Sequence, residues 1–184
     1  MYSELTARMF VGGWVYSTLY VDVLANAGVT HLMNLRREHV DPMVKKQFRV
    51  LECEKGEHDY LSAATFWMKV FDFTVGSQKG SISRLYCHVE NHQLPESPVG
   101  CYAALRALGY TPIEARRKLL GIHPILFWHE KAIQGVESAF QYWVKTRKSD
   151  PVVVRHARLN KIAHVHSSRD FLTYSAISES AEVV

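Results

Sequence analysis

The order of secondary-structure signals constrains this chain most: short apolar runs of strand length alternate with stretches whose apolar residues recur at helical spacing. Strands that alternate with helices form parallel sheets with helices packed on their faces. The sequence therefore predicts an α/β fold with a central, mostly parallel sheet flanked by helices. The predicted strands span 8–13, 29–36, 48–54 and 84–89, and the predicted helices span 18–28, 61–76, 97–109, 111–121 and about 126–146.

Two of these helices carry clear start and stop signals. Ser97 and Thr111 each precede a proline, so we expect each to cap a helix whose first position is proline. Glu114 follows Thr111 at the spacing of a capping box. Gly109 and Gly121 are expected to end the two helices.

Length and composition suggest one domain with an extension. The chain has 184 residues, of which 47% are hydrophobic and 22% charged, enough for a core of its own. We expect the domain to span residues 1–148. Residues 149–184 end in a serine-rich stretch with few large apolar side chains, so a partly ordered C-terminal extension is expected there. The alternative is that this extension folds over a pocket or a partner subunit.

Charge and hydropathy narrow the classes of partner. The net charge is +4, but the basic residues come mostly in pairs separated by acids, so no nucleic-acid partner is expected. The apolar runs are shorter than the ~18 residues that a membrane span needs, and no export leader is recognised, so a soluble, cytoplasmic protein without a membrane partner is expected. Cys53, Cys87 and Cys101 have no CxxC spacing and are expected to be reduced, buried apolar residues.

The polar loop after the strand at 84–89 is the best candidate for a functional site. In an open parallel sheet, ligands bind outside the carboxyl ends of the strands, where loops and helix N-termini meet. The end of the second predicted strand adds Arg36, and the loop after the third adds Glu57, His58 and Asp59. We expect these segments to lie beside one another.

Several stretches share one pattern: "ARMFVGGWVYS" with "VDVLANAGVTHLMNLRREHV", then "LYCHV", "ESPVGCYAALRALGYTPIEARRKL" and "GIHP". Together they resemble the catalytic domain of dual-specificity protein tyrosine phosphatases, in the compact form found among atypical members. The resemblance runs from residue 2 to about residue 145. It implies a cysteine-phosphatase-like fold.

The resemblance also implies a chemistry for the loop. In that family the loop reads His-Cys, five residues and then Arg. The cysteine thiolate attacks phosphorus, and its pKa is lowered by a helix N-terminus and by backbone amides that also hold the phosphate oxygens. The arginine binds two of those oxygens, and an Asp from the loop after the third strand protonates the leaving group.

This chain departs from that motif in both natural registers. If His88 matches the motif histidine, Val89 takes the nucleophile position and Pro95 the arginine position. If the following helix sets the register, the two positions hold Glu90 and Glu96. In either register, both the cysteine and the arginine of the motif are missing.

A third register fails as well, because Cys87 as nucleophile puts Gln93 at the arginine position and no Arg occurs between residues 85 and 105. Glu90 and Glu96 would also repel a phosphate dianion, by roughly 1–4 kcal/mol at ~4 Å. The glycine inside the family's loop is missing, which disfavours a nest of amides around an anion. The sequence therefore predicts that thiol-based phosphatase chemistry has been lost.

The first hypothesis for function is a repurposed pocket. Imidazole beside carboxylate is suited to general acid–base catalysis, because the carboxylate fixes the tautomer of the histidine and moves its pKa. We predict isomerisation, cyclisation, elimination or hydrolysis of a neutral or cationic small molecule, with no cofactor and no metal. The predicted catalytic residues are His88, Glu90, His92, Glu96 and Asp59, and the predicted substrate-binding residues are Asn91, Ser97, Arg36, Glu57 and His58.

Three alternatives stay open. The loop residues can simply be solvated, as polar loops are. The protein can be a non-catalytic pseudophosphatase that binds a protein partner, which exposed aromatic residues would support; that spacing is also typical of a core helix. A metal site is less favoured, since His88 and His92 lie in an irregular turn without an HExxH pattern. The aromatic residues in question are Phe127, Trp128, Phe140, Tyr142 and Trp143, and the further candidate metal ligands are His58, Asp59 and Glu90.

Overall fold

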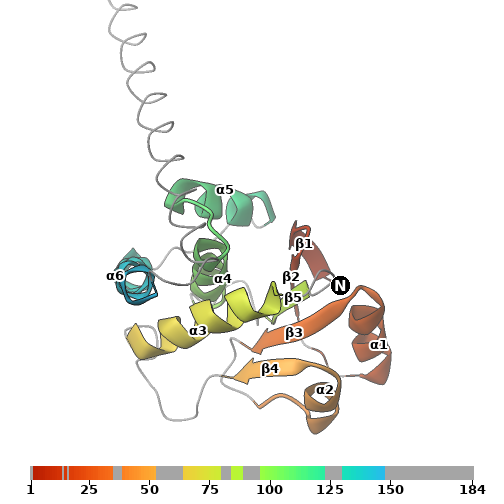
Figure 1. The fold of residues 1–184 in the computed structure, drawn as a ribbon. Coiled ribbons are helices and arrows are strands. Elements are labelled where there is room, and N and C mark those ends of the chain that lie inside the picture. Colours follow the sequence, from red (N-terminus) through yellow and green to blue (C-terminus); the bar gives the residue numbers. More distant parts are fainter. Residues whose placement is uncertain are drawn as a thin grey trace, which may run out of the picture.

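The computed structural model describes most of the region predicted to form the domain. The described residues are 2–13, 15, 17–34, 39–52, 64–79, 84–88, 96–122 and 130–147, without the side chains of His88, Glu96 and Ser97. Strands and helices alternate along the first part of the chain, and helices follow one another in the last part (Figure 1). None of the described helices is long and apolar enough to cross a membrane.

The described strands form one sheet in the order β1-β2-β5-β3-β4. β1 (Tyr2–Thr6) pairs antiparallel with β2 (Met9–Gly12). β2, β5 (Arg84–His88), β3 (Val29–Asn34) and β4 (Arg49–Glu52) run parallel. The predicted, mostly parallel sheet is confirmed, and β1 is an additional edge strand that the sequence analysis did not predict.

Two helices cover one face of the sheet, α1 (Thr18–Asn26) and α2 (Pro42–Gln47) (Figure 1). α1 begins after Ser17, whose hydroxyl accepts a hydrogen bond from a backbone N–H of the first turn. It ends before Gly28, which has a φ of 79° that a residue with a side chain rarely adopts. The core on this face is formed by Phe10, Val15, Val21, Leu24, Val29, Leu32, Val40, Val44, Phe48 and Tyr86.

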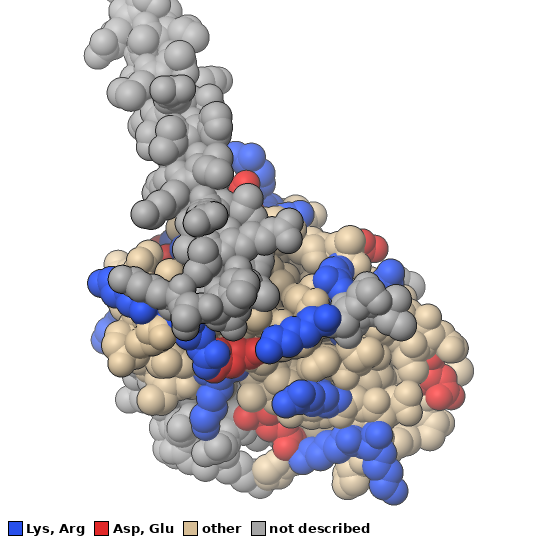
Figure 2. All heavy atoms as spheres, viewed as in Figure 1, with Lys and Arg blue, Asp and Glu red and all other residues tan. Residues whose placement is uncertain are grey.

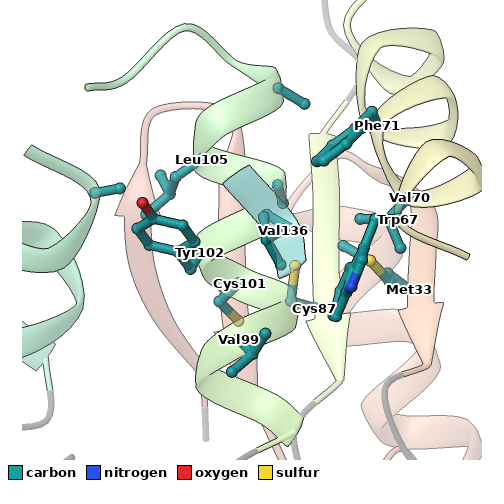
Figure 3. Packing of buried hydrophobic residues seen from close by; sticks show 14 of the residues in the cluster. Met33, Trp67, Val70, Phe71, Cys87, Val99, Cys101, Tyr102, Leu105 and Val136 are labelled. Atoms are coloured by element: carbon teal, nitrogen blue, oxygen red, sulfur yellow. The ribbon is translucent and has the colours of Figure 1, made fainter. Parts of the chain in front are cut away.

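The other face carries the larger core. α3 (Ala64–Ser77), α4 (Glu96–Ala107) and α6 (Glu130–Thr146) pack against one another there, and α5 (Pro112–Ile122) packs beside α4. Buried residues from the sheet and from these helices meet between them (Figure 3). They include Met33, Trp67, Val70, Phe71, Cys87, Val99, Cys101, Tyr102, Leu105 and Val136.

The predicted helices are present, with small differences at their ends. α4 begins at Glu96, so Ser97 lies inside its first turn and does not occupy the predicted capping position. Such a start is compatible with Pro98, because N–H groups in the first turn have no partner within the helix. α5 runs one residue beyond the predicted Gly121. Residues 61–63 and 126–129 of the predicted helices lie outside the described residues.

The capping box before α5 is confirmed. The Glu114 carboxylate accepts hydrogen bonds from the Thr111 backbone N–H and hydroxyl, both at 2.8 Å, and the Glu114 N–H donates to the Thr111 hydroxyl oxygen at 3.3 Å. These hydrogen bonds to the carboxylate lower the pKa of Glu114 below its usual value. Gly109 ends α4 with a φ of 96°.

Candidate functional site at the carboxyl edge of the sheet

The four parallel strands end at one level, which defines the carboxyl edge of the sheet. Gly12 is paired in register with His88, His88 with Asn34, and Asn34 with Glu52. Neighbouring strands lie ~4.8 Å apart, so this row of strand ends is roughly 15 Å long. α4 begins at Glu96, shortly after β5 ends. This is the edge at which the sequence places the site.

The backbone of three predicted site residues is described. His88 is the last residue of β5, and Glu96 and Ser97 are the first two residues of α4. The strand end and the helix start are therefore positioned as the predicted loop requires. The other predicted site residues, Arg36, Glu57, His58, Asp59, Glu90, Asn91 and His92, lie outside the described residues, and their roles stay predictions.

Cys87 is buried in the larger core. Its side chain is 0% exposed, and it lies with Cys101 between β5, α3 and α4, among Val99, Trp67 and Val70 (Figure 3). Burial raises the pKa of the Cys87 thiol, and the neighbouring Cys101 raises it further. A nucleophilic cysteine needs access and a lowered pKa, so Cys87 is not suited to attack a substrate.

The prediction of buried, reduced cysteines is thus confirmed for Cys87 and Cys101, both of which are free thiols. Cys53 lies outside the described residues. The third register, in which Cys87 serves as the nucleophile, finds no support in the packing around this thiol.

Asn34 and Glu52 are polar residues of this edge that the sequence analysis did not select. Asn34 is only 1% exposed, although it lies at the end of a strand. The Glu52 carboxylate accepts from the Val40 N–H at 2.7 Å and pairs with the Lys45 ammonium at 2.6 Å. In the sequence, each of these two residues can be recognised as the polar residue that follows the apolar residues of a predicted strand.

These contacts keep the Glu52 carboxylate ionised. Partial burial acts to raise its pKa, but the hydrogen bonds from Lys45 and from the Val40 N–H outweigh burial, and the pKa is lowered. The imidazole Nδ1 of His39 lies 3.8 Å from the same carboxylate. The end of β4 therefore carries an ion pair between an ionised Glu52 and Lys45.

The end of β2 is shaped by a close contact with Tyr86. The Tyr86 hydroxyl donates a hydrogen bond to the Gly13 carbonyl oxygen at 2.8 Å. A Cβ at Gly12 would lie 2.4 Å from the same hydroxyl oxygen and 3.0 Å from the Cβ of Tyr2. Burial and the neighbouring Tyr20 raise the pKa of Tyr86, so this phenol stays neutral. Gly12 is thus required by Tyr86 of β5, the strand that leads into the candidate site.

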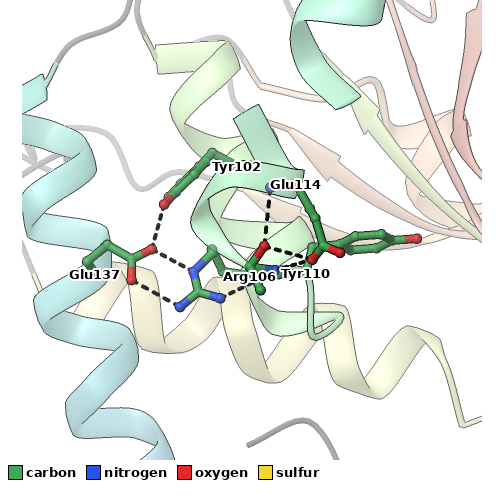
Figure 4. Close-up of polar contacts among 6 residues, drawn as sticks. Tyr102, Arg106, Tyr110, Glu114 and Glu137 are labelled. Atoms are coloured by element: carbon green, nitrogen blue, oxygen red, sulfur yellow. Dashed lines mark hydrogen bonds and ion pairs between the residues drawn. The ribbon is translucent and has the colours of Figure 1, made fainter. Parts of the chain in front are cut away.

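A buried polar network fixes α4, the helix that starts at the edge, against α6 (Figure 4). Arg106 binds the Glu137 carboxylate in bidentate fashion, with Nε–Oε1 at 2.6 Å and Nη2–Oε2 at 3.0 Å. The Tyr102 hydroxyl donates to the same Oε1 at 2.6 Å. The guanidinium carbon also lies 4.3 Å from the ring centroid of Phe140. This network restricts how α4 can move relative to the core.

The predicted aromatic stripe of α6 is mainly part of the core. Phe140 and Trp143 are 3% and 1% exposed, and the Trp143 indole N–H donates to Asp72 at 2.7 Å. Tyr142 is 58% exposed. Phe127 and Trp128 lie outside the described residues. The core interpretation is confirmed for Phe140 and Trp143, so these two residues do not support a binding surface.

Charge is distributed unevenly over the surface. On the face in Figure 2, basic side chains lie at several separate places, some of them beside acidic ones. Within the described part of the chain, no three His, Cys, Asp or Glu side chains come together in a group that could hold a metal ion. The predicted metal alternative involves side chains that are not described, and it stays untested.

No protein-family sequence model and no curated protein matches the chain. Solved structures do match. The crystal structure of PTPMT1 in complex with PI(5)P aligns with a TM-score of 0.65 at 12% identity, over 79% of this chain and 97% of that chain. A mouse protein assigned as a dual specificity phosphatase, complexed with zinc tungstate, aligns with a TM-score of 0.55 at 17% identity, over 82% and 91%.

Human DUSP28 aligns with a TM-score of 0.51 at 19% identity, over 77% of this chain and 91% of that chain. These similarities show the fold, a compact domain like that of the dual-specificity phosphatases. The predicted fold class is thereby confirmed. At these identities the similarity establishes nothing about the reaction.

Proposed function

We propose that this protein uses the carboxyl edge of a phosphatase-like fold for general acid–base chemistry on a neutral or cationic small molecule, and not for phosphate-ester hydrolysis. One observation carries the proposal: the segment from the end of β5 to the start of α4 contains neither cysteine nor arginine, and the cysteine next to it, Cys87, is buried in the core. The cysteine and the arginine on which the family's reaction depends are therefore both missing from this segment.

The charges in this region favour a ligand other than phosphate. Glu90 and Glu96 lie in the segment where the family's loop would hold a phosphate. Like charges at ~4 Å repel by roughly 1–4 kcal/mol, depending on the local dielectric. Negative charge at the edge instead favours a cation, or a neutral molecule that donates hydrogen bonds.

The proposed roles follow from the residue types. His88 or His92 acts as general base or acid, and Glu90 or Glu96 orients that imidazole or serves as a second acid. In this proposal Asp59 or Glu57, from the segment that follows β4, acts on the substrate from the opposite side. Asn91, Ser97, Arg36 and His58 contact the substrate through hydrogen bonds.

Tungstate, the oxyanion bound by the mouse protein above, provides a direct test of anion rejection. A ligand at 100 times its Kd stabilises a folded protein by about 2.7 kcal/mol, which a thermal melt detects. We expect no rise of Tm with tungstate for this protein. The variant Glu90→Gln/Glu96→Gln is expected to gain tungstate binding, whereas the control Glu4→Gln/Asp22→Asn, which loses the same charge on remote elements, is not. Stabilisation of the unmodified protein by tungstate contradicts the proposal.

The acid–base roles are tested with fragments. Neutral, cationic and phosphate-bearing small molecules are screened for binding by ligand-observed NMR, and binders are then tested for turnover. Replacement by His88→Ala, His92→Ala or Glu90→Gln is expected to abolish binding or turnover without loss of folding. Unchanged behaviour of all three variants refutes the assigned roles.

A further inference from the structure

The edge of the sheet opposite the candidate site is strongly basic. We call it the amino edge, and it consists of the described segments that lead into the four parallel strands: residues 6–8, 26–31, 45–49 and 77–79, together with Arg84. The sequence of these segments contains no Asp or Glu. It does contain five cations at the starts of strands or the ends of helices, Arg8, Lys46, Arg49, Lys79 and Arg84, besides Lys45, which pairs with Glu52.

The register shows that three of these cations lie at nearly one level. Leu85 pairs with Met9 and its N–H donates to the Arg8 carbonyl oxygen at 2.9 Å, which places Arg8 beside Arg84. Arg84 pairs with Val29, and Arg49 pairs with His31 on the same central strand. The starts of β2, β5 and β4 therefore each carry an arginine, over a span of roughly 15 Å across the sheet. Lys46 near the end of α2 and Lys79 after α3 lie in the segments that lead into β4 and β5.

Two of the cations also have a structural role. The guanidinium of Arg84 donates to the Ala27 carbonyl oxygen after α1 at 2.9 Å, and that of Arg8 donates to the Gln78 carbonyl oxygen after α3 at 3.3 Å. Each satisfies a carbonyl near a helix C-terminus, whose dipole carries only about half an elementary charge. Most of the positive charge thus remains.

Lys46, Arg49 and Lys79 are exposed and extend the positive surface toward solvent. The charge of Arg49 also acts on its neighbour His31, whose pKa is lowered by burial and additionally by that guanidinium. The concentration of charge is unusual for this chain. The whole sequence has 22 Lys and Arg against 18 Asp and Glu, so without these five cations its net charge would change sign.

We propose that the amino edge is a docking surface for an acidic segment of another protein. An extended peptide rises ~3.3 Å per residue, so about five residues match the row of cations. Exposed Thr30 and Gln47 offer neutral hydrogen-bonding groups in the same row. The surface is distinct from the candidate site, because it lies at the other ends of the same strands.

The composition of the edge favours a peptide over other polyanions. The large apolar residues that are exposed in the described part of the chain are Leu19, Val23, Ile113, Leu120 and Tyr142, and none belongs to these segments. A lipid surface is held by inserted apolar side chains as well as by charge. Single-stranded nucleic acid is held by stacking on exposed aromatic rings, and the described exposed residues of the edge include none.

The test measures binding of fluorescein-labelled octaglutamate by fluorescence anisotropy at low and at physiological salt. We expect salt-dependent binding that the variant Lys46→Glu/Arg49→Glu/Lys79→Glu weakens by about tenfold or more, since each 1.4 kcal/mol changes Kd tenfold. The matched control is Arg117→Glu/Lys131→Glu/Lys145→Glu, which reverses three exposed cations on α5 and α6 and is expected to change Kd less than about threefold. Circular dichroism checks that both variants fold.

An oligonucleotide of equal charge and phosphatidylglycerol vesicles serve as competing probes. Tighter binding of either one at the amino edge overturns the choice of partner. If octaglutamate does not bind, or if the two triple variants weaken its binding equally, the proposal that the amino edge is a docking surface is wrong.

Discussion

At the scale of single residues, Gly12 is the position where the structure leaves least room. A Cβ there would lie 2.4 Å from the Tyr86 hydroxyl oxygen, and the backbone of Tyr2 lies behind it. Gly12→Ala is therefore expected to lower the free energy of unfolding by about 1–3 kcal/mol, as overpacking does. Urea denaturation measures the effect.

Gly13 provides the matched control, since a Cβ there would meet no atom within 4 Å. Gly13→Ala is expected to change stability by less than ~0.5 kcal/mol. In the double variant Gly12→Ala/Tyr86→Phe, removal of the hydroxyl should recover part of the loss. Equal effects of the two glycine substitutions contradict the close approach of Tyr86.

Cys87 gives the second prediction at this scale. Cys87→Ser places a hydroxyl in an apolar core, where the neighbouring Cys101 offers only a weak sulfur partner, and should destabilise the protein by about 1–3 kcal/mol. Because both side chains are buried, iodoacetamide should modify neither Cys87 nor Cys101 while the protein is folded, and burial also raises the pKa of the Cys87 thiol. Mass spectrometry of tryptic peptides reads out the labelling, and rapid modification of Cys87 would show that its environment is misassigned.

At the scale of elements, the network of Arg106, Glu137 and Tyr102 is expected to determine how firmly α4 is held. The Arg106 side chain is 4% exposed, so Glu137→Ala leaves a buried cation without a carboxylate to balance its charge. Loss of one partner of a buried pair costs about 3–5 kcal/mol. Thermal or urea unfolding of the variant measures this loss.

An exposed pair between α5 and α6 offers the comparison. Arg116 and Glu130 make a bidentate contact at 2.7–2.9 Å, but their side chains are 36% and 56% exposed. Glu130→Ala should therefore destabilise the protein far less than Glu137→Ala, because exposed ion pairs contribute little to stability. Similar losses for Glu130→Ala and Glu137→Ala would mean that burial does not separate the two pairs.

The capping box of α5 predicts a pH dependence. The folded-state pKa of Glu114 lies below its ordinary value of 4.5, so its contribution to stability is fully present above that pH and is lost as pH falls through the folded pKa. Thr111→Ala should cost about 1 kcal/mol at neutral pH. The difference between this variant and the unmodified protein should shrink below pH 4.5 in urea titrations. A difference that is constant with pH contradicts the role of the carboxylate.

Sequence patterns predicted the buried elements because burial leaves a periodic trace. β2 is a continuous apolar run, β3 and β5 each contain consecutive buried residues, and α3 and α6 place apolar residues on one face. β1 was missed because its exposed Ser3 and Glu4 interrupt the run at an edge of the sheet. α2 was missed because it is short, although Asp41 caps it and Pro42 follows, a start signal that the sequence does contain.

The candidate site was predictable in position but not in detail. The register confirms that the strand ends of β2, β5, β3 and β4 meet at one edge, as expected for parallel strands. Asn34 and Glu52 were not selected, because their partners come from strand pairing and from α2, which local spacing does not reveal. The amino edge was missed for the same reason: its cations are far apart in sequence, and only the sheet order brings them into one row.

At the scale of the whole molecule, fold and chemistry are separable. The chain shares the fold of dual-specificity phosphatases at 12–19% identity, which a buried pattern of apolar residues suffices to maintain. Both described core clusters are built from residues of the strands and helices. The proposed loss of phosphatase chemistry concerns the segment between β5 and α4, so the same fold can carry a different site.

An assay for hydrolysis of a generic aryl phosphate tests most directly whether the phosphatase-like fold is present without the phosphatase reaction. The assay compares the purified protein with a form in which all three cysteines are replaced by serine, at equal concentration and with folding verified. We expect no release of phosphate above the protein-free background from either form, whatever the pH. Turnover that follows the protein concentration, with or without the cysteines, would contradict the claim that this edge no longer accepts phosphate esters.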